Sequence, residues 1–270
     1  RMINTMSALA SGFTILFLFW TITALVKKIT FLSDEIKTHE MITVLGAGFV
    51  GAMAYTFSDS FWFSAVEGEV YATSSFFTAI VFWAILKWEE VADEPYANRW
   101  IVFIAFMTGL SIGVHLLNLL CIPAMTMVYY FRKGKQSKKN LILTLVLSIL
   151  ILGFVQSGII PWTVKLAGYF ELFFVNIIGL PFNSGTVIYF IVLAGLITGG
   201  LIFSRKNGKT VLNTVFLSVA FILIGYSSFL VLVIRSNANT PINENSPKDA
   251  ISLLGYLNRE QYGDWPILYG

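Results

Sequence analysis

This sequence is poor in cysteine, histidine and charged residues. It contains one cysteine and two histidines among 270 residues. The single cysteine, Cys121, excludes an intrachain disulfide, and its apolar surroundings favour a small core residue. His39 and His115 have no nearby histidine or cysteine partner, so neither is assigned to a zinc site.

Charge is scarce as well. Only 12% of the residues are Asp, Glu, Lys or Arg, about half the share in a typical soluble domain, which is about 25%. Hydrophobic residues make up 56% of the chain, and the mean hydropathy is +0.75. These values indicate a membrane protein. The net charge is only +3, and the basic residues stand in short clusters between apolar runs, so no nucleic-acid partner is expected.

The apolar runs predict an all-α fold, a polytopic bundle of transmembrane helices. A membrane span needs about 20 apolar residues. The run 101–131 is too long for one ordinary span, and Gly113, His115, Asn118 and Pro123 interrupt its middle. It is either one kinked helix or two short helices. The other runs cover residues 4–26, 41–56, 72–86, 141–160, 186–203 and 211–234.

The basic clusters decide between these two interpretations, because Lys and Arg collect in cytoplasmic loops. The clusters at 132–139 and 205–209 are separated by two spans, so both can be cytoplasmic. Two short helices within 101–131 also place Lys27 and Lys28 inside, whereas one crossing places them outside. We therefore expect about eight spans, with a broken helix pair at 101–131. Four segments then face outside: 57–71, 113–118, 161–185 and the tail after residue 235.

The segment 57–71 holds three carboxylates, Asp59, Glu67 and Glu69, among aromatic residues. A carboxylate at a membrane boundary is costly unless it is hydrated, paired or coordinating an ion. The spacing of Glu67 and Glu69 suits a divalent cation, Mg²⁺ or Mn²⁺, which commonly bridges substrate phosphates. We expect these acids to contact a metal or an acceptor substrate. The alternative is a solvated loop within an aromatic belt.

Three further polar residues are candidates on the outer side. His115 and Asn118 occupy the break in 101–131, where helix ends leave backbone groups free. They can bind a phosphate or sugar there, or His115 can simply satisfy the free carbonyls. Arg235, at the outer end of the last span, can neutralise a phosphate or anchor the helix at the interface.

Glycine patterns are interpreted as packing features. The stretch 41–51 contains a G-x-G-x-x-G pattern that is typical of dinucleotide-binding folds. Such a fold needs strands that alternate with amphipathic helices, and this sequence has long apolar runs instead. We expect these glycines, and the pairs Gly109/Gly113 and Gly195/Gly199, to pack helices together. No P-loop or G-x-S-x-G elbow is present, which disfavours an ATPase or a serine hydrolase.

The composition divides the chain into two regions. Residues 1–235 form the expected transmembrane region, and residues 236–270 form an external polar loop or the start of a soluble segment. A helix-like stretch follows at 248–262. The mixed segment 162–181 suits a helix that lies in the membrane interface, and it is not counted as a span.

Three strings carry a resemblance to a known family: FSDSFWFSAVEGEVY at 57–71, GLSIGVHLLN at 109–118 with Pro123, and YLNREQYG at 256–263. Through them the chain resembles a Bacteroidota membrane protein family that is related to the transmembrane protein O-mannosyltransferases of the GT-C glycosyltransferase superfamily. The resemblance implies a multi-span enzyme of the bacterial inner membrane. Such an enzyme moves a sugar, mannose or a similar hexose, from a polyprenyl-phosphate donor to a protein acceptor on the periplasmic face.

The resemblance also implies roles for the candidate residues. It implies that the catalytic carboxylate lies in an acidic loop upstream of Arg1, so the catalytic residue is unknown in this sequence, which we interpret as a fragment. The acids Asp59, Glu67 and Glu69 then support a metal or the acceptor. The expected contacts to the phosphate or sugar of the donor are His115, Asn118 and Arg235.

Two alternatives come from other functional classes: a polytopic transporter and a non-catalytic membrane scaffold subunit. A carrier should place its polar residues near the middle of the membrane, whereas these candidates gather at one face.

Overall fold

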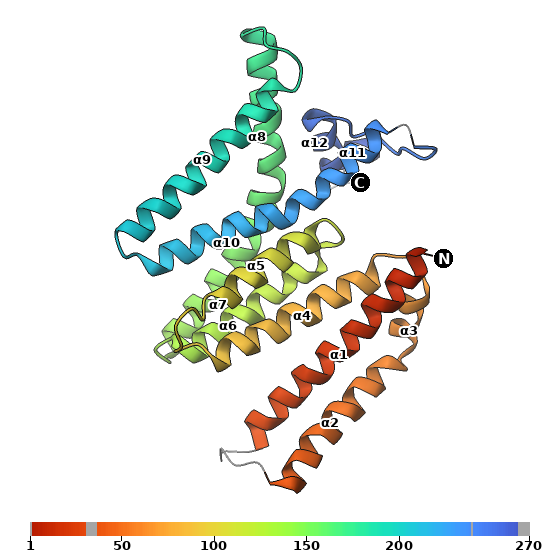
Figure 1. Cartoon of the computed structure of the whole chain (residues 1–270), viewed down its shortest axis with the longest axis vertical. Coiled ribbons are helices and arrows are strands. Elements are labelled where there is room, and N and C mark those ends of the chain that lie inside the picture. The colour runs from red at the N-terminus through yellow and green to blue at the C-terminus, as the bar shows by residue number, and fades with distance from the viewer. Residues whose placement is uncertain (1, 31–36, 239, 264–270) are drawn as a thin grey trace, which may run out of the picture. The chain divides into compact units, whose positions relative to one another are not determined.

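The computed structural model describes residues 2–30, 37–238 and 240–263, and every regular element in these residues is a helix (Figure 1). The predicted all-α class is confirmed. The helices divide into two compact units. Unit 1 comprises Arg1–Ser148 and Phe221–Tyr226, and unit 2 comprises Ile149–Ala220 and Ser227–Gly270.

Unit 1 is built around α4. Its core side chains recur with the period of a helix, at Ile80, Val81, Ala84, Ile85 and Trp88. α4 contacts α1, α5 and α6, and α1 also contacts α2. The elements are α1 (Met2–Thr30), α2 (Thr38–Thr56), α3 (Asp59–Val66), α4 (Tyr71–Glu90), α5 (Arg99–Ile112), the 3₁₀ helix η1 (Leu116–Leu120), α6 (Cys121–Lys133) and the start of α7 (Lys138–Gly153).

Contacts at both ends of α1 show that α1 and α4 run in the same direction. Near the start of α1, Asn4 Nδ2 donates to the carbonyl of Val66, five residues before α4 begins, at 2.9 Å. Near the end of α1, Lys28 forms an ion pair with Glu89. We call the end of unit 1 near Asn4 and Val66 the His115 end, and the end near Lys28 and Glu89 the Lys28 end.

The predicted broken pair at 101–131 is confirmed as a hairpin. α5 ends at Ile112, η1 follows, and α6 runs back. Arg132 and Lys133 at the end of α6 both bond to Asp93, which precedes α5, so α6 ends where α5 began. The break therefore lies at the opposite end from Lys28. The two helices have 14 and 13 residues, a rise of about 20 Å each.

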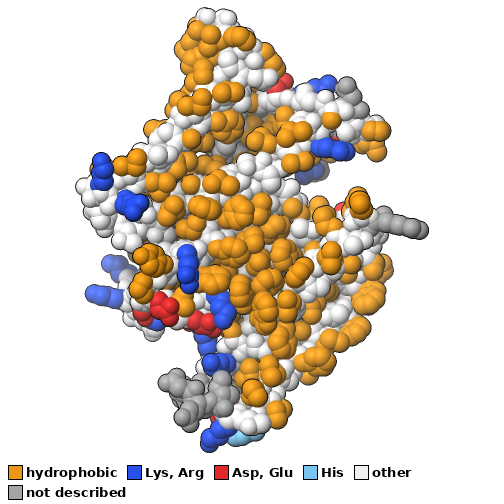
Figure 2. Space-filling model, in the orientation of Figure 1, with side chains coloured by type: hydrophobic (Ala, Val, Ile, Leu, Met, Phe, Trp, Pro, Cys, Tyr) orange, Lys and Arg blue, Asp and Glu red, His pale blue; other side chains and the backbone are white. Residues whose placement is uncertain are grey.

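The expected count of eight spans is not confirmed. α5 and α6 are too short to be counted as spans, and α4 is more polar than the helices that are counted. By length and composition, four stretches of the described residues can cross a membrane: Met2–Thr30, Lys138–Ile177, Ser184–Lys206 and Thr210–Asn237. α2 and α3 pass together as a fifth, a pair bent by 69°. Hydrophobic side chains cover much of the face seen in Figure 2, as expected for helices that face lipid.

Unit 2 packs α8 against both α9 and α12. The predicted helix at 248–262 is confirmed by α12 and η5, and Asp249 caps α12 by accepting from the N–H groups of Ile251 and Ser252. The elements after α7 are the π-helix η2 (Phe154–Ile159), α8 (Ile160–Leu172), the π-helix η3 (Phe173–Ile177), α9 (Ser184–Lys206), α10 (Thr210–Tyr226), the 3₁₀ helix η4 (Ser227–Phe229), α11 (Leu230–Asn237), α12 (Ala250–Asn258) and the 3₁₀ helix η5 (Glu260–Tyr262).

The helix predicted at 162–181 is confirmed as far as Ile177, but no break separates it from the preceding apolar run. The chain stays helical from Lys138 to Ile177. Pro161 stands in the first turn of α8, directly after the π-helix η2. A π-turn shifts the hydrogen-bond pattern by one residue, so the helix passes a proline that cannot donate. The interfacial position of 162–181 stays a prediction.

The interpretation of 41–51 as a packing face is confirmed for Gly48 and Gly51 but not for Gly46, which has no described atom within 4 Å of an added Cβ. A Cβ added at Gly48 would lie 2.5 Å from Cγ2 of Thr23, and one at Gly51 would lie 2.7 Å from Cδ1 of Ile22. Both contacts are closer than real Cβ atoms allow. These two glycines therefore let α2 approach α1 closely, and both stand inside a helix that begins at Thr38.

The two other glycine pairs differ. A Cβ added at Gly109 would lie 2.2 Å from the carbonyl oxygen of Ile222, in the part of α10 that belongs to unit 1. This confirms a packing role for Gly109. Gly195 and Gly199 have nothing within 4 Å of an added Cβ. The packing role predicted for that pair is wrong, because its face of α9 is open among the described residues.

Candidate functional site

The acidic segment 57–71 forms α3 and the bend into α4. Asp59 begins α3, and Glu67 follows its last residue. Since α3 has eight residues, these carboxylates stand about 12 Å apart along the axis. All three acids are exposed, and no side-chain bond to another described residue is found for them. The structure therefore groups Glu67 with Glu69 and leaves Asp59 at the start of α3, where the helix dipole favours an acid.

The acidic segment and the break between α5 and α6 lie together. The ring of Tyr71, two residues after Glu69, lies against the imidazole of His115, with 5.7 Å between the ring centroids. The carbonyl of Val66 accepts the Asn4 bond described above. The segment and the break were both predicted to share one side of the protein, and they meet at the His115 end of unit 1.

His115 caps η1. Its Nδ1 accepts a hydrogen bond from the N–H of Leu117 at 3.1 Å, so the neutral ring carries its proton on Nε2. The side chain is half-buried. His115 therefore has a structural role, but its ring accepts from an N–H instead of donating to a free carbonyl as predicted, and the bond uses only one of the two ring nitrogens. Nε2–H remains as a donor for a ligand.

Asn118 lies beneath the break. It is 1% exposed, and its Nδ2 donates to Oγ of Ser111 at 3.0 Å. Its Oδ1 is buried and has no hydrogen-bond partner in the described part of the chain. His115 reaches the surface, and Asn118 does not.

Arg235 belongs to unit 2, in the last turn of α11, and it is exposed. The next residue, Ser236, exchanges two hydrogen bonds of 3.0 Å with Asn243, which fixes the start of the polar tail. The contact of Arg235 with a donor phosphate stays a prediction.

The metal site also stays a prediction. Within the described residues, no group of three or more His, Cys, Asp and Glu side chains could hold a metal ion. Glu67 and Glu69 supply two carboxylates at most. A Mg²⁺ or Mn²⁺ ion on them would take its other ligands from water and from substrate phosphates.

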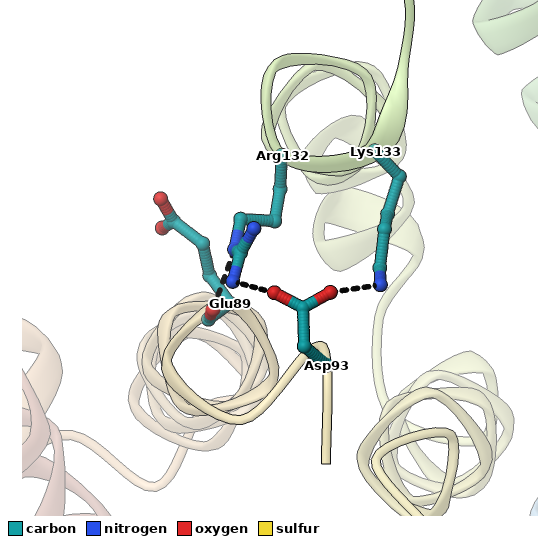
Figure 3. Close-up of polar contacts among 4 residues, drawn as sticks. All are labelled: Glu89, Asp93, Arg132 and Lys133. Carbon is teal, nitrogen blue, oxygen red and sulfur yellow. Dashed lines mark hydrogen bonds and ion pairs between the residues drawn. The ribbon is translucent and has the colours of Figure 1, made fainter.

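The Lys28 end is held by ion pairs (Figure 3). Asp93 accepts from Arg132 and from Lys133, the latter at 2.5 Å, and Arg132 Nε donates to the carbonyl of Glu89 at 3.2 Å. Lys133 and then Arg132 hold the pKa of Asp93 below its ordinary value. These pairs were not predicted from the sequence. They join the base of the α5–α6 hairpin to α4, so their role is structural.

A buried carboxylate in unit 2 was also missed. Glu171 is 3% exposed. Its Oε1 accepts from the N–H of Asn183 at 2.5 Å, and its Oε2 accepts from the N–H and Oγ1 of Thr186 at 2.9 and 3.1 Å. Glu171 on α8 therefore caps the start of α9. No local motif announces this cap, because it comes from the preceding helix.

Comparison with known proteins identifies the family of this chain. Residues 1–139 match the family described as the protein O-mannosyl-transferase TMEM260 N-terminal domain. The chain belongs to this family. The TMEM260 N-terminal domain in this chain holds α1 to α6, including both the acidic segment and the His115 break. No curated protein and no solved structure matches the chain. The resemblance to O-mannosyltransferases is confirmed, and its finer assignment to Bacteroidota and GT-C stays a prediction.

Proposed function

We propose that the chain is part of a GT-C-type membrane glycosyltransferase that moves mannose or a similar hexose from a polyprenyl-phosphate donor to a protein acceptor. Membership of the TMEM260 N-terminal domain family supports protein O-mannosyl transfer. The donor lipid, the identity of the sugar and the outer face of a bacterial inner membrane belong to the proposal.

The observation that carries the proposal is the meeting of the acidic segment with the His115 break. Tyr71 joins them, so Glu69 in the bend before α4 and the imidazole at the break after α5 approach the same region. Carboxylates, an imidazole donor and aromatic rings at a helix break suit a ligand that has both a sugar and a phosphate. If the acidic segment and the His115 break lay at opposite ends of unit 1, they would not support this function.

The transfer itself divides between two kinds of group. An acceptor hydroxyl oxygen forms a bond to the sugar C1 as the bond from C1 to the phosphate oxygen breaks, and a carboxylate takes the hydroxyl proton. The family resemblance implies that this carboxylate comes from an acidic loop. Within this chain, Nε2–H of His115 would donate to the departing phosphate, and Glu67 and Glu69 would hold the acceptor or a cation that neutralises the phosphate.

The charge distribution of unit 1 supports an outer site. Lys28, Arg132 and Lys133 lie at the Lys28 end, and basic residues favour the cytoplasmic side. The His115 end then faces outward, where a lipid-linked sugar and an exported acceptor protein meet.

The test uses the full chain in membranes with a polyprenyl-phosphate mannose and an acceptor peptide. The double variant Glu67→Gln/Glu69→Gln should lose at least about tenfold in peptide labelling, with an unchanged melting temperature. Glu94→Gln is the matched control, since Glu94 is an exposed acid near Asp93. Labelling by the double variant at the control rate would remove both acids from the mechanism.

A carrier is the second candidate, because α2 and α3 form a pair bent by 69° and broken helices line substrate paths in transporters. Proteoliposomes separate the two functions. Sugar that crosses the bilayer while the peptide stays unlabelled would favour a carrier. Labelled peptide without transport of the donor would favour the transferase.

A further inference from the structure

A cavity of about 400 Å³ lies at the Lys28 end of unit 1, between α1 and α4, with α2 at its side. Both main helices line it with positions on a single face: residues 20, 23, 24 and 27 of α1, and residues 83, 86, 87 and 90 of α4. These spacings are i, i+3, i+4 and i+7. The side chains with ligand-binding character are Trp20, Thr23, Lys27, Trp83, Lys87 and Glu90.

The inner part of the cavity is aromatic. The rings of Trp20 and Trp83 lie 5.6 Å apart, and Phe17 packs against both. Trp20 is 39% exposed, so this aromatic wall reaches the surface of the protein. Lys27 follows Trp20 by seven residues on the same helix, a rise of about 10 Å. Tryptophan below lysine is the order expected across the boundary between lipid chains and headgroups.

The outer part of the cavity is basic. Lys28 forms an ion pair with Glu89, and Lys87 forms one with Glu90 at 2.7 Å. Lys27 is exposed and makes no ion pair with another described residue. Helix dipoles explain a lysine in the last turn of α1 and of α4, but they do not explain an open cavity between them. Two lysines and one glutamate leave the lining with an excess of one positive charge.

We propose that this cavity binds the phosphate headgroup of an anionic membrane phospholipid, which pairs with Lys27 and Lys87 while an acyl chain lies along Trp20 and Trp83. Basic pockets between membrane helices recognise such headgroups on the cytoplasmic side. The site is separate from sugar transfer, because its lining lies at the Lys28 end and the candidate transferase residues lie at the His115 end.

The full chain in a neutral detergent provides the test. Titration with short-chain phosphatidylglycerol should raise the melting temperature in a saturable way, whereas phosphatidylcholine with the same chains and inorganic phosphate should not. Lys27→Gln should weaken the apparent affinity roughly fivefold, and Lys27→Arg should restore it. Lys135→Gln, an exposed lysine just after α6, is the matched control.

Several outcomes would overturn the proposal. An equal shift with phosphatidylcholine would mean that only the acyl chain binds, and an equal shift with inorganic phosphate would mean that no lipid is needed. The same affinity in Lys27→Gln and the unmodified chain, or an equal loss in Lys135→Gln, would remove Lys27 from the site. Melting of each variant without lipid shows whether it is folded before titration.

Discussion

The imidazole of His115 lies against the ring of Tyr71, with 5.7 Å between their centroids. This contact joins the turn of the α5–α6 hairpin to the first residue of α4, two positions after Glu69. Because Nδ1 of His115 already accepts from Leu117, only Nε2 is left for a ligand. The two nitrogens can therefore be tested separately.

His115→Asn should separate capping from transfer. Asparagine is a good N-cap acceptor, so the variant should keep its melting temperature while it loses Nε2–H and transfer activity. His115→Ala should lose both, with about 1 kcal/mol of stability from the missing cap. Peptide labelling and thermal unfolding of the two variants check this. Full activity in His115→Asn would show that the side chain only caps η1.

Glu171→Ala should destabilise unit 2. The substitution leaves the N–H groups of Asn183 and Thr186 without their acceptor at a partly buried helix start, at a cost of about 1–3 kcal/mol. Glu171→Gln keeps one acceptor oxygen and should lose less. Hydrogen exchange across residues 183–187 would measure the opening of this helix end. Equal protection in the alanine variant and the unmodified chain would contradict the capping role.

Asp93 should make stability depend on acid pH. Lys133 and Arg132 lower its pKa from the ordinary value of 3.8 in the folded chain. A lowered folded pKa means that the stabilisation is present above the ordinary pKa and is lost as the pH falls through the lowered value. Melting temperatures from pH 7 down to about pH 3 should therefore fall less steeply in Asp93→Asn.

The control for this pH series is Glu94→Gln, because Glu94 is exposed, lies outside the helices and has no side-chain partner among the described residues. It should keep the acid dependence of the unmodified chain. An acid profile of Asp93→Asn that matches the unmodified one would show that the ion pairs of Figure 3 do not contribute in solution.

Gly109→Val should disrupt the close contact of α5 with Ile222. A Cβ there would lie 2.2 Å from a backbone carbonyl oxygen, which cannot move aside as a flexible side chain can. Overpacking of this kind costs about 1–3 kcal/mol or more. Gly12→Val, at a helix position with nothing within 4 Å of an added Cβ, is the matched control. Equal melting temperatures of the two variants would contradict this contact.

Much of unit 1 could be predicted from the sequence, because a few residues constrained it. The interruption at Gly113 and His115, together with the basic clusters, predicted the reversal between α5 and α6. The distribution of Lys and Arg over the loops also placed Lys28 at the opposite end from the acidic segment. These predictions rest on charge and hydropathy, which act over whole segments and tolerate local errors.

The features that escaped prediction depend on single contacts between distant residues. The apolar run was predicted to end at Ile160, but a π-turn just before Pro161 lets the helix continue. Asn118 looked like a surface ligand and is buried against Ser111. The cap that Glu171 supplies to α9 and the pairs around Asp93 are set by packing, and no local pattern encodes them.

The short hairpin has a consequence for the bilayer around unit 1. A helix of 14 residues rises about 21 Å, whereas the hydrocarbon layer is about 30 Å thick. With the Asp93 end at one membrane surface, the last residue of α5 would lie roughly 9 Å short of the other. Hydrophobic mismatch of this size is relieved by local thinning of the membrane, which would bring the polar surface of the lipid down to the imidazole.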